Sequence, residues 1–129
     1  MPLKVEVVTP EREVVVADDA TFVLAHGIEG DVGILPSMAP MLIALGVGPM
    51  KIEREGGDKQ ILLDGGFLQV KDDRVIILAE YAVIPEEADT QQVAARIEEL
   101  KRKIQSEMEN EHAKRELARQ EALHRMLRM

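Results

Sequence analysis

Short apolar runs, rich in Val and Ile and separated by turn residues, cover the chain from Leu3 to about Ile84. Residues 3–7 alternate between apolar and polar, which predicts a strand with one solvent-facing side. Residues 13–16 and 21–24 are nearly continuous apolar runs, which favours strands covered on both faces. This pattern predicts nine or ten short strands, too many for one flat sheet of ordinary size, so we expect two packed sheets.

Turn residues divide these runs. Gly56 and Gly57 separate two strand-like segments and predict a tight hairpin, because glycine readily adopts the positive φ that such turns need. Asp72 and Asp73 predict a second hairpin turn, and we interpret the acidic pair at residues 18–19 as turn residues as well.

The pattern changes to a helical period after Pro85. Asp89 can cap a helix start, with Gln92 three residues on to reciprocate. One apolar seam then follows at helical spacing: Val93, Ile97, Leu100, Ile104 and Met108. A second capping pattern at residues 106–109, followed by Asn110, predicts a break near residues 106–111.

The segment after this break carries two modest apolar strips separated by arginines. One strip consists of Ala113, Leu117, Leu123 and Leu127, and the other of Ala118, Ala122, Met126 and Met129. We therefore expect an all-β sandwich at residues 1–84 and a two-helix domain at residues 85–129. The break is marked only by caps, so the helices can form a hairpin or one nearly continuous helix.

The amino-acid composition limits which ligands the protein can bind and which covalent or metal chemistry it can support. Only three residues are aromatic, so the core must be aliphatic and a base-stacking surface is disfavoured. Because no residue is cysteine, a disulfide framework and a thiolate metal site are excluded. No stretch is long and apolar enough for a spanning helix, and the first residues lack the order of a signal peptide, so we expect a soluble, untargeted protein.

Charge is distributed unevenly along the chain. The net charge of −8 disfavours nucleic acid and anionic lipid as partners. Residues 112–129 reverse this sign, because they carry five basic residues against two acidic ones. This basic segment contains Lys114, Arg115, Arg119, Arg125 and Arg128.

The sequence also bears on two other functional classes, an enzyme and an adaptor protein. His26, His112 and His124 have neither a metal-ligand spacing nor a triad arrangement, so we expect no catalytic site. A coiled-coil adaptor or transcription-channel factor is an alternative, because Glu107 and Glu109 place acidic side chains where the tip of a helical hairpin would fall, together with Glu111.

Four segments in order resemble the epsilon subunit of F-type ATP synthases of the bacterial type: residues 7–12, 27–42, 63–70 and 75–80. The resemblance implies a flattened ten-stranded β-sandwich followed by an antiparallel helix pair. It also implies a non-catalytic rotor subunit at the foot of the central stalk, in contact with the gamma subunit on one side and the membrane c-ring on the other. Such a protein lies on the cytoplasmic face of the inner membrane, which it contacts only indirectly, and it couples ion-driven rotation to ATP synthesis. The coupling ion, proton or sodium, stays open.

The resemblance also assigns residues to partners. Asp31 matches the acidic position that the family associates with the ring. Met38 stands where members commonly carry a histidine, and its thioether can pack but not titrate, which puts a polar contact with gamma in doubt. For the basic final helix we expect an inhibitory contact with acidic loops of the alpha/beta catalytic head, made by Arg115, Arg119, Arg125 and Arg128.

No cofactor is expected. Family members that bind ATP between their helices share a short pattern at the helix start, which this chain keeps at Asp89 and loses at Gln92 and Val93. Without the arginine of that pattern, a phosphate group loses its bidentate, charge-assisted hydrogen bonds.

Overall fold

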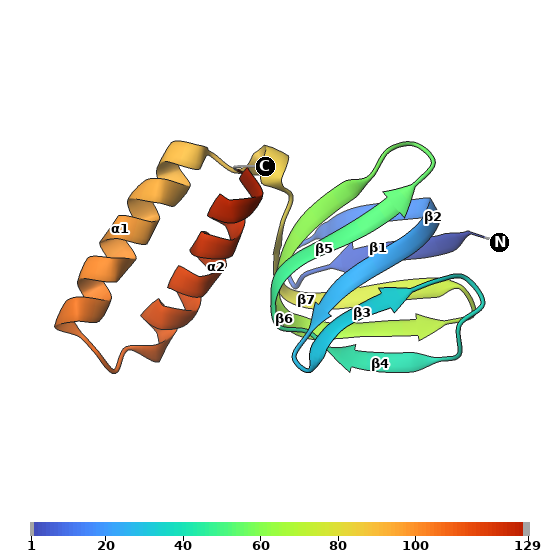
Figure 1. Ribbon diagram of the computed structural model, residues 1–129, viewed down its shortest axis with the longest axis horizontal. Coiled ribbons are helices and arrows are strands. Elements are labelled where there is room, and N and C mark those ends of the chain that lie inside the picture. The colour runs from blue at the N-terminus through green and yellow to red at the C-terminus, as the bar shows by residue number, and fades with distance from the viewer. Residues whose placement is uncertain (1, 128–129) are drawn as a thin grey trace. The chain divides into compact units, whose positions relative to one another are not determined.

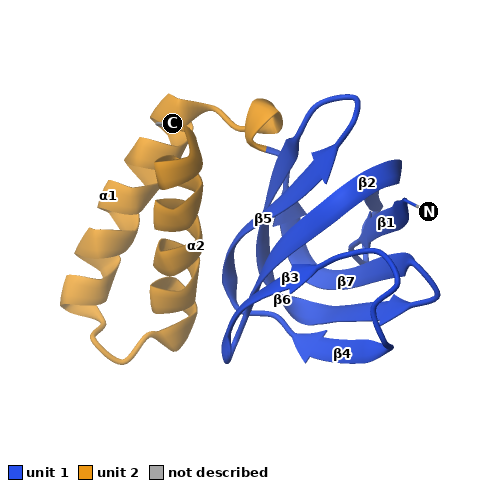
Figure 2. Ribbon diagram, turned by 45° about the vertical axis from the view of Figure 1, so that its right-hand side comes forward, with its two compact units in different colours: residues 1–84 blue, residues 85–129 orange. Residues whose placement is uncertain are grey.

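The computed structural model describes residues 2–127 and divides into two compact units, residues 1–84 and residues 85–129. Figure 2 distinguishes the units by colour. Seven strands form the first unit (Figure 1), namely β1 (Leu3–Val8), β2 (Glu13–Gly27), β3 (Gly30–Ile34), β4 (Met41–Ala44), β5 (Val47–Arg54), β6 (Lys59–Lys71) and β7 (Arg74–Val83). The second unit contains a short 3₁₀ helix, η1 (Pro85–Glu87), and the helices α1 (Thr90–Ser106) and α2 (Glu111–Leu127).

The strand pairings form a closed circuit. The strand order is β1-β7-β6-β5-β2-β3, and β1 also pairs antiparallel with β2. The pairing of β1 with β7 is parallel, whereas the other pairings are antiparallel. Because the circuit closes, the two layers of the sandwich are continuous with each other.

The long strands β2 and β6 each serve both layers. The first half of β6 pairs with β5, and its second half pairs with β4, while β7 runs beside both halves. The change of partner falls at Gly65 and Gly66, whose φ angles are +77° and +110°. These two glycines therefore allow one strand to turn from one layer into the other.

The expected fold class is confirmed, whereas the expected number of strands is wrong. The core between the layers is aliphatic, as composition requires, and its fully buried members include Leu3, Met50, Ile61 and Ile77. Residues 13–16 and 21–24 were expected as separate strands but belong to one fifteen-residue strand, β2. A register shift between Ala20 and Phe22 breaks the alternation there, so one bent strand looks like two in the sequence.

Of the two acidic pairs expected in turns, one forms a turn and the other lies inside a strand. Asp72 and Asp73 form the two-residue turn between β6 and β7 with φ angles of +51° and +60°. Residues 18–19, in contrast, lie inside β2, where Asp19 accepts a hydrogen bond from Arg54 of β5 at 3.0 Å. The Arg54 guanidinium lowers the pKa of the Asp19 carboxyl, which keeps this cross-strand ion pair charged.

In the helical unit, the first helix is capped at the expected residue, whereas the second helix is capped at a different one. Asp89 caps α1 by accepting hydrogen bonds from the backbone N–H groups of Gln91 and Gln92 at 2.8 and 3.1 Å. The expected capping role of Ser106 is wrong, because its hydroxyl donates back to carbonyls of α1. Asn110 caps α2 instead, with its side-chain oxygen accepting from the N–H of Ala113 at 3.0 Å.

Candidate partner-binding sites

The hairpin between β2 and β3 presents the first candidate site. Gly27 pairs with Gly30 across the two-residue tip, and Gly30 has a φ of +130°. Asp31 follows directly at the start of β3, with 62% of its side chain exposed. Ile28 is 68% exposed at the tip, so this hairpin offers an apolar and an acidic side chain together.

A concave surface adjoins this tip. It is lined by the hairpin residues 27–32 and by residues 42–44 of β4. The backbone of the tip is fastened to the β4 segment, because the N–H of Ile28 donates to the carbonyl of Ala44 at 3.0 Å. Asp31 itself is bonded to His26, whose Nδ1 lies 2.7 Å from Asp31 Oδ1.

Met38 lies in the segment between β3 and β4 and turns toward the sandwich. Its side chain is half-buried and packs against the aliphatic core, and its sulfur accepts a hydrogen bond from the N–H of Leu35 at 3.1 Å. Much of the Met38 side chain is therefore buried within the strand unit. A contact between Met38 and another subunit stays a prediction.

A second candidate site is an exposed apolar face on neighbouring strands. Phe67 of β6 pairs with Leu78 of β7, and the side chains are 54% and 59% exposed. Ala44 of β4 pairs with Phe67, and Val8 of β1 pairs with Leu78, so four strands contribute to one row. Leu42 precedes Ala44 by two residues, so it lies on the same face of β4, and it is 69% exposed. We call this set the outer apolar face: Val8, Leu42, Ala44, Phe67 and Leu78.

The outer apolar face also contains a shallow depression, lined by residues 8–10, 66–67 and 78–80. Exposed, contiguous apolar surface of this kind is uncommon outside interaction sites. The sequence predictions did not include it. The sequence signal for this face was the unbroken apolar run of residues 75–79. Apolar residues on both faces of a strand indicate that both faces are buried, and here only a binding partner could bury the outer one.

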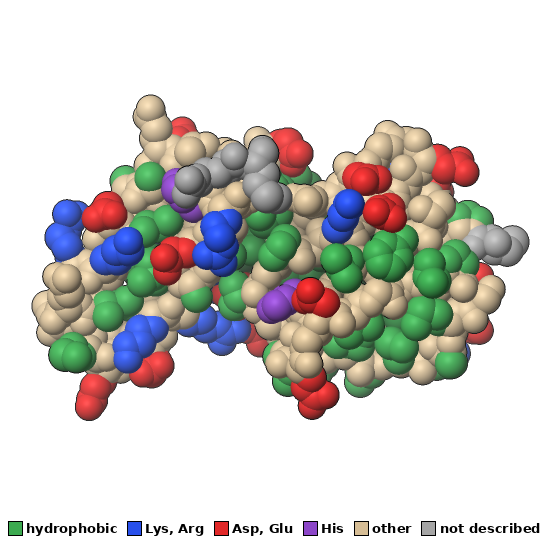
Figure 3. All heavy atoms as spheres, in the orientation of Figure 1, with side chains coloured by type: hydrophobic (Ala, Val, Ile, Leu, Met, Phe, Trp, Pro, Cys, Tyr) green, Lys and Arg blue, Asp and Glu red, His purple; other side chains and the backbone are tan. Residues whose placement is uncertain are grey.

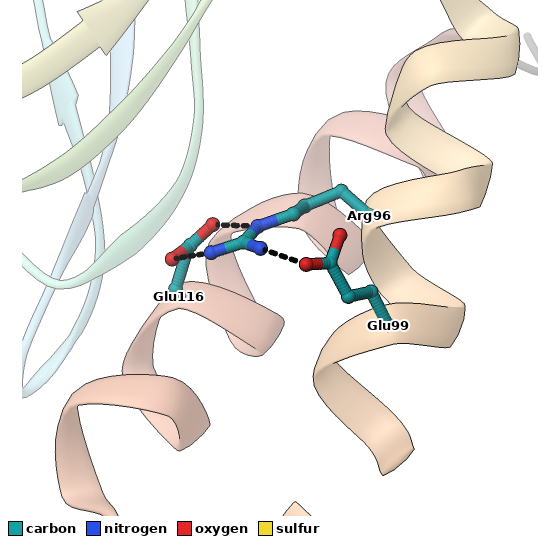
Figure 4. Close-up of polar contacts among 3 residues, drawn as sticks. All are labelled: Arg96, Glu99 and Glu116. Atoms are coloured by element: carbon teal, nitrogen blue, oxygen red, sulfur yellow. Dashed lines mark hydrogen bonds and ion pairs between the residues drawn. The ribbon is translucent and has the colours of Figure 1, made fainter. Parts of the chain in front are cut away.

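The helical unit is joined by an ion pair at its centre. Figure 4 shows the Arg96 guanidinium of α1 directed at Glu116 of α2. The Arg96 Nε and Nη2 atoms donate to the two Glu116 carboxylate oxygens at 2.6 and 2.8 Å, and Nη1 lies 3.0 Å from Glu99. The Arg96 hydrogen bonds lower the pKa of Glu116, and this pairing raises the pKa of Arg96.

The basic residues of the final helix differ in exposure. Arg115 and Arg125 are exposed, whereas Arg119 is half-buried, and Arg128 lies outside the described residues. Arg125 borders a groove between the helices, which is also lined by Lys101, His124 and the carboxylates of Glu98 and Glu121. Figure 3 shows charged side chains of both signs along this unit, while apolar side chains gather over the strand unit.

The polar side chains in the first half of α1 have structural roles in the helical unit. The Asp89 carboxylate serves the helix cap, and the Arg96 guanidinium is bound by Glu116 and Glu99. Gln92 and Val93 are exposed and buried, respectively, on the first turn of α1.

Among residues 2–127, no cluster of His, Cys, Asp or Glu side chains has the arrangement of a metal site. In that same range, no helix is both long and apolar enough to span a membrane.

Comparisons with known proteins agree on one family. Residues 2–85 match the family model described as "ATP synthase, Delta/Epsilon chain, beta-sandwich domain". The ATP synthase epsilon chain of Carboxydothermus hydrogenoformans is 41% identical over 102 residues, which cover 79% of this chain and 75% of the relative. That of Shouchella clausii is 35% identical over 127 residues, 96% of this chain and 92% of the relative.

A solved structure shows the same similarity over both units. A chain in the cryo-EM structure of the Euglena gracilis mitochondrial ATP synthase, comprising OSCP, F1 and the c-ring, matches with a TM-score of 0.80 and 26% identity. The match covers 98% of this chain and 81% of the other. These findings replace the adaptor alternative. The chain belongs to the ATP synthase epsilon chain family, the non-catalytic central-stalk subunits of ATP synthase.

Proposed function

We propose that this subunit couples the gamma subunit to the c-ring by using two separate surfaces of its strand unit. The outer apolar face binds gamma, and the β2–β3 hairpin tip contacts polar loops of the ring through Asp31. The observation that carries the proposal is the outer apolar face itself, where Leu42, Phe67 and Leu78 each expose more than half of their side chains. Binding would bury this apolar surface and supply the main driving force for association.

The helical unit has a regulatory role in this proposal. The basic final helix engages acidic loops of the alpha/beta catalytic head and stops the rotor in the direction of ATP hydrolysis. The net positive charge of residues 112–129, within a chain of net charge −8, supports this role because complementary charge steers an encounter and fixes its register. The subunit thus acts at the cytoplasmic face of the inner membrane, as a peripheral part of the complex.

Substitution of one leucine tests the gamma contact. We expect Leu78→Asp to abolish co-purification with gamma, because an unpaired carboxylate would be buried at the centre of the interface. Leu24→Asp is the matched control, since Leu24 is also an exposed strand leucine, 37% exposed, and lies outside the outer apolar face. Retention of gamma by Leu78→Asp, or equal loss in both variants, would contradict the proposed surface.

A further inference from the structure

His26 and Asp31 face each other directly across the β2–β3 hairpin. They are register partners in the antiparallel ladder, so their side chains point to the same side. A carboxylate can only accept, so the imidazole Nδ1–H is the donor in the 2.7 Å bond to Asp31 Oδ1. The bond involves one carboxylate oxygen, and the lone pairs of Oδ2 lie outside it.

The imidazole lies close against a glycine-lined part of a neighbouring segment. A Cβ atom placed on Gly48 would lie 2.9 Å from His26 Cγ and 3.0 Å from Cδ2, and one on Gly46 would lie 3.6 Å from Cδ2. The N–H of Gly46 also donates to the His26 carbonyl at 3.0 Å. Glycine at position 48 therefore gives the ring room to lie beside the backbone, in the position from which Nδ1 reaches Asp31.

The backbone around the tip is held by separate bonds. Gly27 forms a bridge with Leu45, and Ile28 is bonded to Ala44. The freedom that remains to Asp31 is in its side-chain torsions, and an exposed carboxylate on a hairpin normally samples several rotamers. The hydrogen bond from His26 restricts those torsions.

We propose that His26 is a positioning residue that holds the Asp31 carboxylate in one orientation for donor groups on the ring. This inference rests on the proposed contact between Asp31 and the ring. The orientation lowers the ordering cost of the contact, because part of the side-chain entropy is already lost before binding. Gly48 supports the arrangement by leaving space for the imidazole.

Side-chain couplings of Asp31, measured by NMR on the full-length protein, test the positioning directly. We expect couplings of a single χ1 rotamer in the native protein and averaged couplings in His26→Leu, which keeps a side chain of similar bulk without a donor. His26→Asn should restore the single rotamer, because its amide nitrogen takes the place of Nδ1. Gly48→Ala should also average the couplings, because the added methyl group displaces the imidazole.

Ring binding supplies the second readout, with the purified c-ring as the probe. We expect His26→Leu to weaken binding about two- to fivefold, the range of a partly exposed polar interaction, and His26→Asn to restore it. A single Asp31 rotamer in His26→Leu would overturn the positioning role, regardless of the measured affinity for the c-ring. If the couplings average but neither His26→Leu nor Asp31→Asn changes ring binding, the ring contact itself is wrong, and the role of His26 falls with it.

Discussion

Two glycines with similar φ angles show how differently single residues constrain the strand unit. Gly57, in the turn between β5 and β6, has a φ of +114°, and apart from Gly57 and its two chain neighbours no heavy atom lies within 4 Å of where a Cβ would stand. Gly66 has a φ of +110°, but a Cβ there would lie 2.1 Å from the carbonyl oxygen of Leu78 and 2.8 Å from Ala79 Cα. Both neighbours are backbone atoms of β7, so they cannot move without breaking the ladder.

Alanine substitution should separate these two constraints. We expect Gly66→Ala to lower the free energy of unfolding by more than about 4 kcal/mol, because torsional strain and a backbone clash combine. Gly57→Ala should cost only about 1–3 kcal/mol, the cost of strain alone. Urea unfolding followed through Tyr81, the single tyrosine, measures both in the strand unit. Similar losses in the two variants would show that the bend at Gly66 does not need a glycine.

At the scale of elements, the contact between α1 and α2 combines an apolar seam with one bidentate ion pair. Val93, Ile97 and Leu100 of α1 are buried, and Met108 at the end of the expected seam is 74% exposed in the turn. Apolar contacts are not directional, whereas the planar Arg96 guanidinium binds Glu116 in one geometry. The ion pair therefore favours this register of the hairpin over a straightened helix.

Acid should weaken the hairpin through Glu116. Because pairing with Arg96 lowers the folded-state pKa of Glu116, its stabilisation is present above the ordinary pKa of 4.5 and is lost as pH falls through the folded-state pKa. Spin labels on cysteines introduced at residues 95 and 118 would report this, since the native chain has no cysteine. We expect the population with a long label distance to rise severalfold below pH 4.

Glu116→Gln should show the raised population already at pH 7, and its hairpin should respond less to acid. Glu121→Gln is the control, because it removes a carboxylate from the same helix without touching the Arg96 pair. An unchanged distance distribution in Glu116→Gln would mean that the apolar seam alone sets the hairpin.

The helix pair should not bind ATP at millimolar concentration. Asp89 is occupied by the cap of α1, and position 92 carries an amide where a guanidinium would bind phosphate. Isothermal titration with Mg-ATP should give no saturable heat, and Gln92→Arg, which restores the pattern at that position, provides a comparison. Saturable binding by the native chain would overturn this expectation.

At the scale of the whole molecule, the proposed function assigns attachment to the strand unit and regulation to the helical unit. Net positive charge occurs only in the last part of the helical unit, since residues 1–84 carry a net charge of −7, residues 85–111 one of −4 and residues 112–129 one of +3. The proposed braking action needs the positive segment to reach the catalytic head while the strand unit stays bound to the stalk.

Removal of the basic helix should relieve the proposed inhibition of ATP hydrolysis. We expect truncation after residue 110 to raise ATP hydrolysis by the assembled complex severalfold without loss of the subunit from the stalk. A full-length variant with Arg115, Arg119 and Arg125 changed to Gln should have the same direction of effect, and it keeps the helix. The control changes the three basic residues 101–103 of α1 to Gln. Hydrolysis at the native rate in the truncated complex would exclude an inhibitory tail.

Local patterns in the sequence were sufficient to predict the two-unit order, the aliphatic core, the hairpin turn at Asp72 and Asp73 and the start of α1 at Asp89. These features depend on residues close in the chain, through periodicity, turn torsions and side-chain caps. The candidate ring contact at Asp31 came from resemblance to the family.

Tertiary structure decided which residues lie together from distant parts of the chain. The length of β2 and β6, the outer apolar face from four strands, the pairing of Arg96 with Glu116 and the packing of His26 beside Gly48 all depend on strand register or helix packing. A one-residue change of strand register would move the strand side chains to the opposite face, and a one-residue shift along a helix would turn Arg96 away from Glu116 by about 100°. Their positions therefore follow from the balance of contacts over the whole unit, which no local pattern contains.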